Sequence, residues 1–157
     1  MSELRTNKIY PRNGLLSGAN GGIVQVVEAT MSNAGATSTT SSTLVETGLQ
    51  ATITPSSASN KILCIWTLHI RNDGARSGTG LRRNSTDIFG YREAYGALTD
   101  GGVTHTFQYI DSPATTSATT YKVMFAVNSG TALLTDVGGI LATGSNVHRI
   151  TLMEISG

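Results

Sequence analysis

The residue types that carry most protein chemistry are few in this chain and widely spaced. The sequence has three histidines, His69, His105 and His148, and a single cysteine, Cys64. No two histidines have the short spacing that places two ligands on one metal ion, and one thiol forms no internal disulfide. We therefore expect no metal, no cofactor, histidines at the surface or at a subunit interface, and a buried Cys64. A metal site assembled from ligands on separate strands is the alternative.

Catalytic arrangements are also missing from the pattern. Serine is abundant, but no Gly-x-Ser-x-Gly segment is present, and the glycines at 18–22 and 138–139 lack the Lys-Ser/Thr of a phosphate loop. The carboxylates that fall mostly in predicted turns are Asp73, Asp87, Glu93, Asp100, Asp111 and Asp136. A glycosidase needs two carboxylates facing one cleft, and the sequence leaves that open. We predict that the protein is not an enzyme and keep a small hydrolase as the third hypothesis.

One segment, residues 71–95, concentrates groups suited to recognition. It holds five of the eleven basic residues together with two tyrosines. Guanidinium groups and exposed tyrosines bind anionic sugars or protein partners. The candidate contact residues are Arg76, Arg82, Arg83, Tyr91, Arg92 and Tyr95. The alternative is a solvated loop in which arginines pair with Asp73, Asp87 and Glu93.

The elements that position these residues are predicted to be β-strands. Ser and Thr make up 39 of 157 residues and Gly a further 18, a composition that favours strands and turns. Charged residues are only 13% and the net charge is +1, which argues against a nucleic-acid partner. No apolar stretch is long enough to span a membrane or to act as a secretion leader. We therefore expect no membrane insertion and assembly in a cytoplasm.

The strongest strand pattern is residues 61–71. Its apolar face consists of Ile62, Cys64, Trp66, Leu68 and Ile70. The opposite face begins apolar and turns polar, which predicts a strand that starts centrally and emerges into solvent. Residues 72–80 are expected to be a polar loop and residues 89–102 an irregular excursion. Further strands are expected at residues 4–10, 23–31, 43–54, 81–88, 104–110, 121–127, 131–135 and 147–155.

Such a series of short strands separated by Gly, Ser and Pro turns favours an all-β fold. We predict an antiparallel, jelly-roll-like β-sandwich. The periodicity of apolar residues does not define the topology of its strands. Residues 1–22 are expected to be an attachment strand and linker, and residues 23–157 the sandwich head. Threonine-rich faces with few charges also favour contact between identical copies.

Four segments resemble a known group of proteins. They are residues 4–9 with Pro11 and Gly14 (LRTNKI), residues 52–63 (TITPSSASNKIL), residues 109–121 (YIDSPATTSATTY) and residues 150–155 (ITLMEI). Residues 81–86 (LRRNST) resemble a strand start of the same group, with Asn84 where glycine is commoner. The chain resembles small virion proteins, or fibre-terminal domains, of marine tailed bacteriophages, including those that infect cyanobacteria. The resemblance touches most of the chain, although its motifs serve turns and strands.

The resemblance implies a β-sandwich head, trimeric and on the outside of a phage particle, with no catalytic residues. We expect Leu4, Ile9 and Tyr10 to anchor the head to another virion protein. The expected partners are further copies in a homotrimer, other virion proteins and a host surface glycan, and the expected location is the virion. Host attachment is the favoured function. A capsid decoration protein and a free carbohydrate-binding module are the alternatives.

Overall fold

The computed structural model describes residues 22–31, 37–72, 76–94, 102–134 and 148–157, without the side chains of 91–94 and 102. These segments form ten strands and contain no helix. The described part of the chain accordingly holds no helix able to cross a membrane. The strands are β1 (Ile23–Met31), β2 (Ser38–Thr39), β3 (Val45–Ile53), β4 (Lys61–Asn72), β5 (Ser77–Arg83), β6 (Thr86–Ala94), β7 (Gly102–Asp111), β8 (Thr119–Val127), β9 (Ala132–Leu134) and β10 (His148–Ile155).

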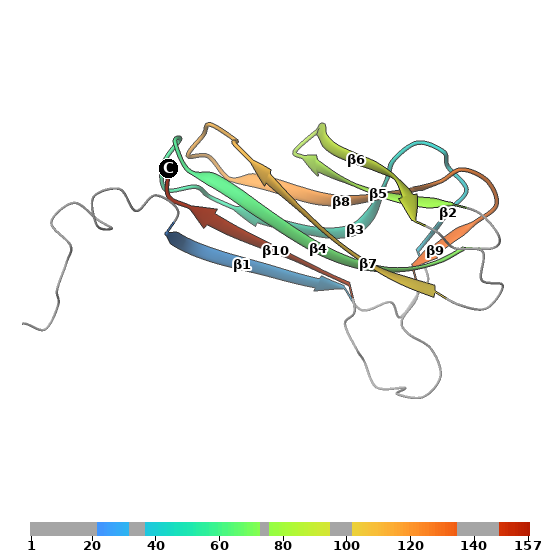
Figure 1. The fold of residues 1–157 in the computed structure, drawn as a ribbon. Coiled ribbons are helices and arrows are strands. Elements are labelled where there is room, and N and C mark those ends of the chain that lie inside the picture. The colour runs from blue at the N-terminus through green and yellow to red at the C-terminus, as the bar shows by residue number, and fades with distance from the viewer. Residues whose placement is uncertain (1–21, 32–36, 73–75, 95–101, 135–147) are drawn as a thin grey trace, which may run out of the picture.

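The eight longer strands form two antiparallel sheets. Sheet A has the order β1-β10-β4-β7, with the short β9 and β2 continuing beside the end of β4, and sheet B has the order β3-β8-β5-β6. Taken in chain order, the first of the eight pairs with the last, the second with the seventh, the third with the sixth and the fourth with the fifth. This nesting is one long hairpin rolled into two layers, the arrangement of a jelly roll. The predicted antiparallel sandwich is confirmed, and Figure 1 shows its two layers.

The core lies between the two sheets and is centred on Trp66 of β4. Its side chain is fully buried, and its ring stacks on Phe107 with centroids 5.9 Å apart and meets Phe89 edge-on at 5.6 Å. The indole Nε1 donates a hydrogen bond of 3.0 Å to Thr79 Oγ1 on β5. The Thr79 hydroxyl in turn donates to the carbonyl oxygen of Met124 on β8 at 2.9 Å. Trp66 therefore joins sheet A to sheet B by packing and by hydrogen bonding.

The chain between residues 77 and 94 differs from the sequence prediction. It forms a hairpin, β5 with β6, where the sequence predicted a loop, a single strand over residues 81–88 and an excursion. The turn falls at Asn84 and Ser85, in the middle of the predicted strand. Asn84 has a φ of 53°, a left-handed conformation that Asn tolerates better than most residues. Its Oδ1 accepts a hydrogen bond from the backbone N–H of Thr120, so the asparagine also secures the turn to β8.

Strand β4 is central along its whole length. It pairs with β10 over residues 61–67, with β9 over residues 70–72, and with β7 over residues 62–71. The prediction that its polar end emerges into solvent holds only in part, because Thr67 and Arg71 are partly exposed whereas His69 is only 8% exposed. Leu63 and Ile65, at the apolar end of the same face, are also partly exposed.

Candidate functional site

The described structure has a groove on the outer face of sheet B. Its volume is about 710 Å³, and it is lined by the loop before β3, the start of β5, part of β6 and the end of β8. The polar residues that line it are Ser42, Thr43, Arg76, Ser77, Asp87 and Asn128. Two hydrogen bonds hold one end together, because the Arg76 N–H donates to the Asn128 side-chain Oδ1 and the Asn128 N–H donates to the Arg76 carbonyl oxygen. The groove thus has a fixed frame with polar groups at its edge.

The floor of the groove consists of small residues on neighbouring strands. Gly78 on β5 lies opposite Ala126 on β8, and both line the groove together with Gly90 on β6. A ligand in the groove would therefore approach the backbone of sheet B closely. Glycine serves this purpose in many proteins because it has no Cβ.

Leu44 covers the sheet beside this floor. A Cβ atom on Gly80 would lie 2.7 Å from Leu44 Cδ1 and 2.7 Å from the carbonyl oxygen of Phe89, so glycine is required there. Gly80 pairs with Gly90, whose Cβ position lies 3.6 Å from the same Leu44 atom. Because glycine is typical of turns, these residues contributed to the prediction of a loop. They lie in paired strands instead, because the chain before β3 packs on them.

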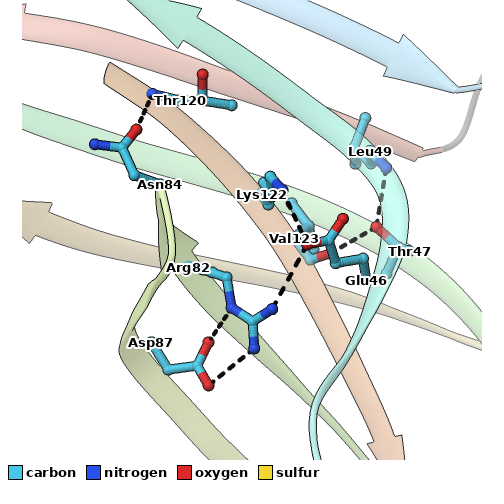
Figure 2. A network of polar contacts seen from close by, with 9 residues as sticks. All are labelled: Glu46, Thr47, Leu49, Arg82, Asn84, Asp87, Thr120, Lys122 and Val123. Carbon is cyan, nitrogen blue, oxygen red and sulfur yellow. Dashed lines mark hydrogen bonds and ion pairs between the residues drawn. The ribbon is translucent and has the colours of Figure 1, made fainter. Parts of the chain in front are cut away.

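A row of charged residues with alternating signs crosses the same face (Figure 2). Asp87 accepts from Arg82 Nε at 2.6 Å, Arg82 Nη1 lies 3.5 Å from Glu46 Oε1, and Lys122 Nζ lies 2.9 Å from the same oxygen. The hydrogen bond from Lys122 is the main reason why the pKa of Glu46 lies below its usual value. These pairs are surface pairs, so each contributes little to stability. The alternative predicted from sequence, pairing of the arginines with nearby carboxylates, is observed for Arg82 and Asp87.

Arg83 faces away from this row, because successive residues of a strand point to opposite faces. Its Nη1 donates to both carboxylate oxygens of Asp111, at 3.0 and 2.9 Å, at the end of β7. The hydroxyl of Tyr121, on β8, also donates to Asp111, at 2.6 Å. Burial and then this hydrogen bond raise the pKa of Tyr121. The cluster ties β7 to sheet B, so the contacts of Arg83 and Asp111 are structural.

A second buried carboxylate belongs to Glu154, near the end of β10. It accepts hydrogen bonds from the N–H and hydroxyl of Ser56, both 2.7 Å, from Asn60 Nδ2 at 2.6 Å, and from Gln25 Nε2. Burial alone would raise the pKa of Glu154, but these hydrogen bonds outweigh it and lower the pKa to about 2. The Glu154 carboxylate thus holds the turn before β4 against β1 and β10. The segments 52–63 and 150–155, both part of the sequence resemblance, meet at this cluster.

The histidines do not form a metal site in the described residues. The backbone N–H of His69 donates to Nδ1 of His148 at 3.2 Å, and the His69 ring bonds Thr104 Oγ1 at 3.0 Å. His148 is fully buried and His69 nearly so, which corrects the expectation of surface or interface positions for these two. Among the residues that the structure describes, no group of three or more His, Cys, Asp or Glu side chains is placed to hold a metal ion. Cys64 is buried as predicted, and burial raises the pKa of its thiol.

The six candidate contact residues are therefore not all in one place. Arg76 lines the groove, Arg82 lies in the charged row beside it, and Arg83 is engaged at the end of the sandwich. Tyr91 and Arg92 are on β6, opposite residues 79 and 78, and their side chains lie outside the description. The candidates that lie outside the described residues altogether are Tyr95 and the anchor residues Leu4, Ile9 and Tyr10.

Sequence reasoning missed the other side of the groove. Leu44 was a signal, because it is a large apolar residue at the end of the Ser/Thr-rich run 37–43. Asn128 begins an Asn-Ser-Gly turn, and nothing in the local pattern places that turn beside Arg76. The groove depends on contacts between segments about 50 residues apart in sequence.

No protein-family model and no curated protein sequence matches this chain. Among solved structures, it is similar to dimeric latent PorU from Porphyromonas gingivalis (7% identity, TM-score 0.43), covering 89% of this chain and 14% of that one. It is similar to the structure of infectious bursal disease virus, Gx strain (13% identity, TM-score 0.45), covering 98% of this chain and 42% of that one. It is also similar to the sugar-binding EclA C-terminal domain (17% identity, TM-score 0.32), covering 99% of this chain and 98% of that one. This chain therefore spans less than half of the first two proteins.

Proposed function

We propose that this chain is a non-enzymatic structural protein of a bacteriophage virion. It forms a homotrimeric fibre or knob that is exposed on the particle and aids attachment to the host. The resemblance of segments 4–9, 52–63, 109–121 and 150–155 to phage virion proteins supports the virion setting. The observation that carries the attachment function is the groove on sheet B, with polar groups at its edge and small residues on its floor.

The groove is suited to binding rather than to hydrolysis. Its described lining includes a single carboxylate, Asp87, whereas glycoside hydrolysis uses two that flank the scissile bond. Asp87 is itself held in an ion pair with Arg82. The buried carboxylates Asp111 and Glu154 are occupied by hydrogen-bond donors in the protein.

A host surface glycan is the ligand that this lining fits best. The hydroxyls of Ser42 and Thr43, the amide of Asn128 and the guanidinium of Arg76 match the hydroxyl and carboxylate groups of sugars. The described residues of the floor, Gly78, Gly90 and Ala126, have no long side chains and would let a sugar ring reach the sheet. The residues 1–22 attach the head to a neighbouring virion protein.

The experiment measures binding of the purified full chain to host surface polysaccharide, together with release of reducing ends. The groove variant is Ala126→Gln, which places a longer side chain on the floor. The matched control is Thr52→Gln, an exposed position of β3 in the same sheet, outside the groove lining. We expect about tenfold weaker binding for Ala126→Gln, unchanged binding for the control, and no reducing ends from any of the three proteins. Equal binding by all three proteins would mean that the groove is not the binding site for the polysaccharide. Released reducing ends would make the chain a hydrolase.

Two further assays separate the alternatives. A capsid decoration protein binds purified capsids and leaves host polysaccharide unbound. A free carbohydrate-binding module binds the polysaccharide as a monomer and does not copurify with particles. The proposed attachment protein binds the polysaccharide, copurifies with particles and is a trimer in solution.

A further inference from the structure

Four apolar side chains form a row across the outer face of sheet A, one from each long strand. The strand register aligns Val26 of β1 with Met153 of β10, Met153 with Leu63 of β4, and Leu63 with Ile110 of β7. Val26 and Ile110, at the two ends of this apolar row, are 54% and 55% exposed. The row lies on the side of sheet A that faces away from the core.

The apolar character extends along the strands on both sides of this row. Ile23 pairs with Ile155 on one side, and Ile65 follows on the other side. Ile23 is 61% exposed and the neighbouring Val24 is 48% exposed. Single exposed apolar residues are ordinary on protein surfaces, but a contiguous patch marks a site of interaction.

The sequence of strand β4 also indicates that the outer face of sheet A is covered by a partner. A strand that is apolar on both faces is normally covered on both faces. Trp66 and its neighbours are covered by sheet B, whereas Leu63 and Ile65 are only partly covered within the chain.

The size of the face indicates a protein partner. Its four long strands, of 8 to 12 residues, are spaced about 4.8 Å apart and rise about 3.4 Å per residue, so the face measures about 600 Å². A standard protein–protein interface buries about 800 Å² on each partner, with an apolar centre and a polar rim. Beyond the row the same face is rich in hydroxyls, including Thr67 and Thr106, whose Oγ1 atoms lie 2.9 Å apart.

We propose that a second copy of this chain covers the outer face of sheet A. The inference rests on the proposed self-association and names its surface. Glu28 of β1 and Arg149 of β10 lie on this face on neighbouring strands, so each copy offers both signs of charge to the other. In a closed homotrimer three such faces surround the three-fold axis, so that each apolar row lies against the rows of both neighbouring copies, with hydroxyls around them.

The test compares the native mass of the full chain with that of the double variant Val26→Lys/Ile110→Lys. The matched control is Thr52→Lys, an exposed position on the outer face of sheet B. We expect a trimer for the natural sequence and for Thr52→Lys, and a monomer for the double variant. A double variant that stays trimeric would move the contact elsewhere while leaving self-association intact. If the natural chain is monomeric at all concentrations, both the self-association and the proposed contact surface are wrong. Glycan binding by the groove is tested separately.

A second measurement applies even if the double variant does not fold. The natural thiol, Cys64, is buried, so Ile110→Cys introduces an accessible thiol of known position. We expect a maleimide to label this thiol slowly in the assembly and rapidly after dilution to monomer. Thr52→Cys is the control and is labelled rapidly in both states. Rapid labelling of Ile110→Cys in the assembly would overturn the proposal.

Discussion

Replacing Trp66 by alanine tests the core that supports both outer faces. The indole is fully buried, contacts Phe89 and Phe107, and donates a hydrogen bond to Thr79. Loss of such a side chain costs about 3–5 kcal/mol, because transfer free energy is lost and a cavity remains. For a chain of this length, about 2–4 °C of Tm is lost per kcal/mol, so the Tm should fall by about 6–20 °C.

The control is Trp66→Phe, which keeps an aromatic ring in the core and loses the Nε1 hydrogen bond. The Thr79 hydroxyl retains the carbonyl oxygen of Met124 as its acceptor, so no buried hydroxyl is left without a partner. We expect a cost of about 1–2 kcal/mol for this variant. Both variants are measured by urea and thermal unfolding at one protein concentration, because association shifts the apparent stability. A Tm unchanged by Trp66→Ala would refute the placement of β4 in the core.

Other consequences follow from particular contacts. The low pKa of Glu154, about 2, means that its stabilising contribution is complete above about pH 4.5 and is lost as the pH falls through 2. Glu154→Gln should therefore destabilise the protein at pH 7, and the difference in Tm from the natural chain should shrink on acidification; a constant difference would contradict this role. Asn84→Gly should change the free energy of unfolding, measured in urea, by no more than about 1 kcal/mol, whereas Asn84→Val should lower it by more, because a β-branched residue is strained at positive φ. Deletion of residues 1–17 should leave the circular dichroism of the head unchanged and abolish incorporation into particles; a truncated chain that does not fold would assign the segment to the sandwich.

The alternation of apolar residues predicts much of the strand content. The patterns at 23–31, 104–110, 121–127 and 147–155 coincide with β1, β7, β8 and β10 to within a few residues. The hairpin of β5 and β6 was missed because its glycines and the turn at Asn84 interrupt the period of two. Glycine is normally a turn signal, and here it serves the close packing of Leu44 on the sheet.

The nested pairing of the strands follows from contacts between distant residues, which periodicity does not encode. The same limit applies to the groove. Sequence identified Arg76, Arg82 and Arg83 as one cluster, and the structure distributes them between the groove, the charged row and the end of the sandwich. The alternation of faces along β5 explains why the two adjacent arginines separate.

Inhibition of phage adsorption is the direct test of host attachment through the groove of sheet B. Particles that carry this chain are mixed with host cells in the presence of excess purified natural chain, Ala126→Gln or Thr52→Gln, and the particles left unadsorbed are counted. We expect that the natural chain and Thr52→Gln block adsorption and that Ala126→Gln does not. Adsorption that proceeds equally with all three proteins would contradict the claim that this head attaches the virion to its host through the groove of sheet B.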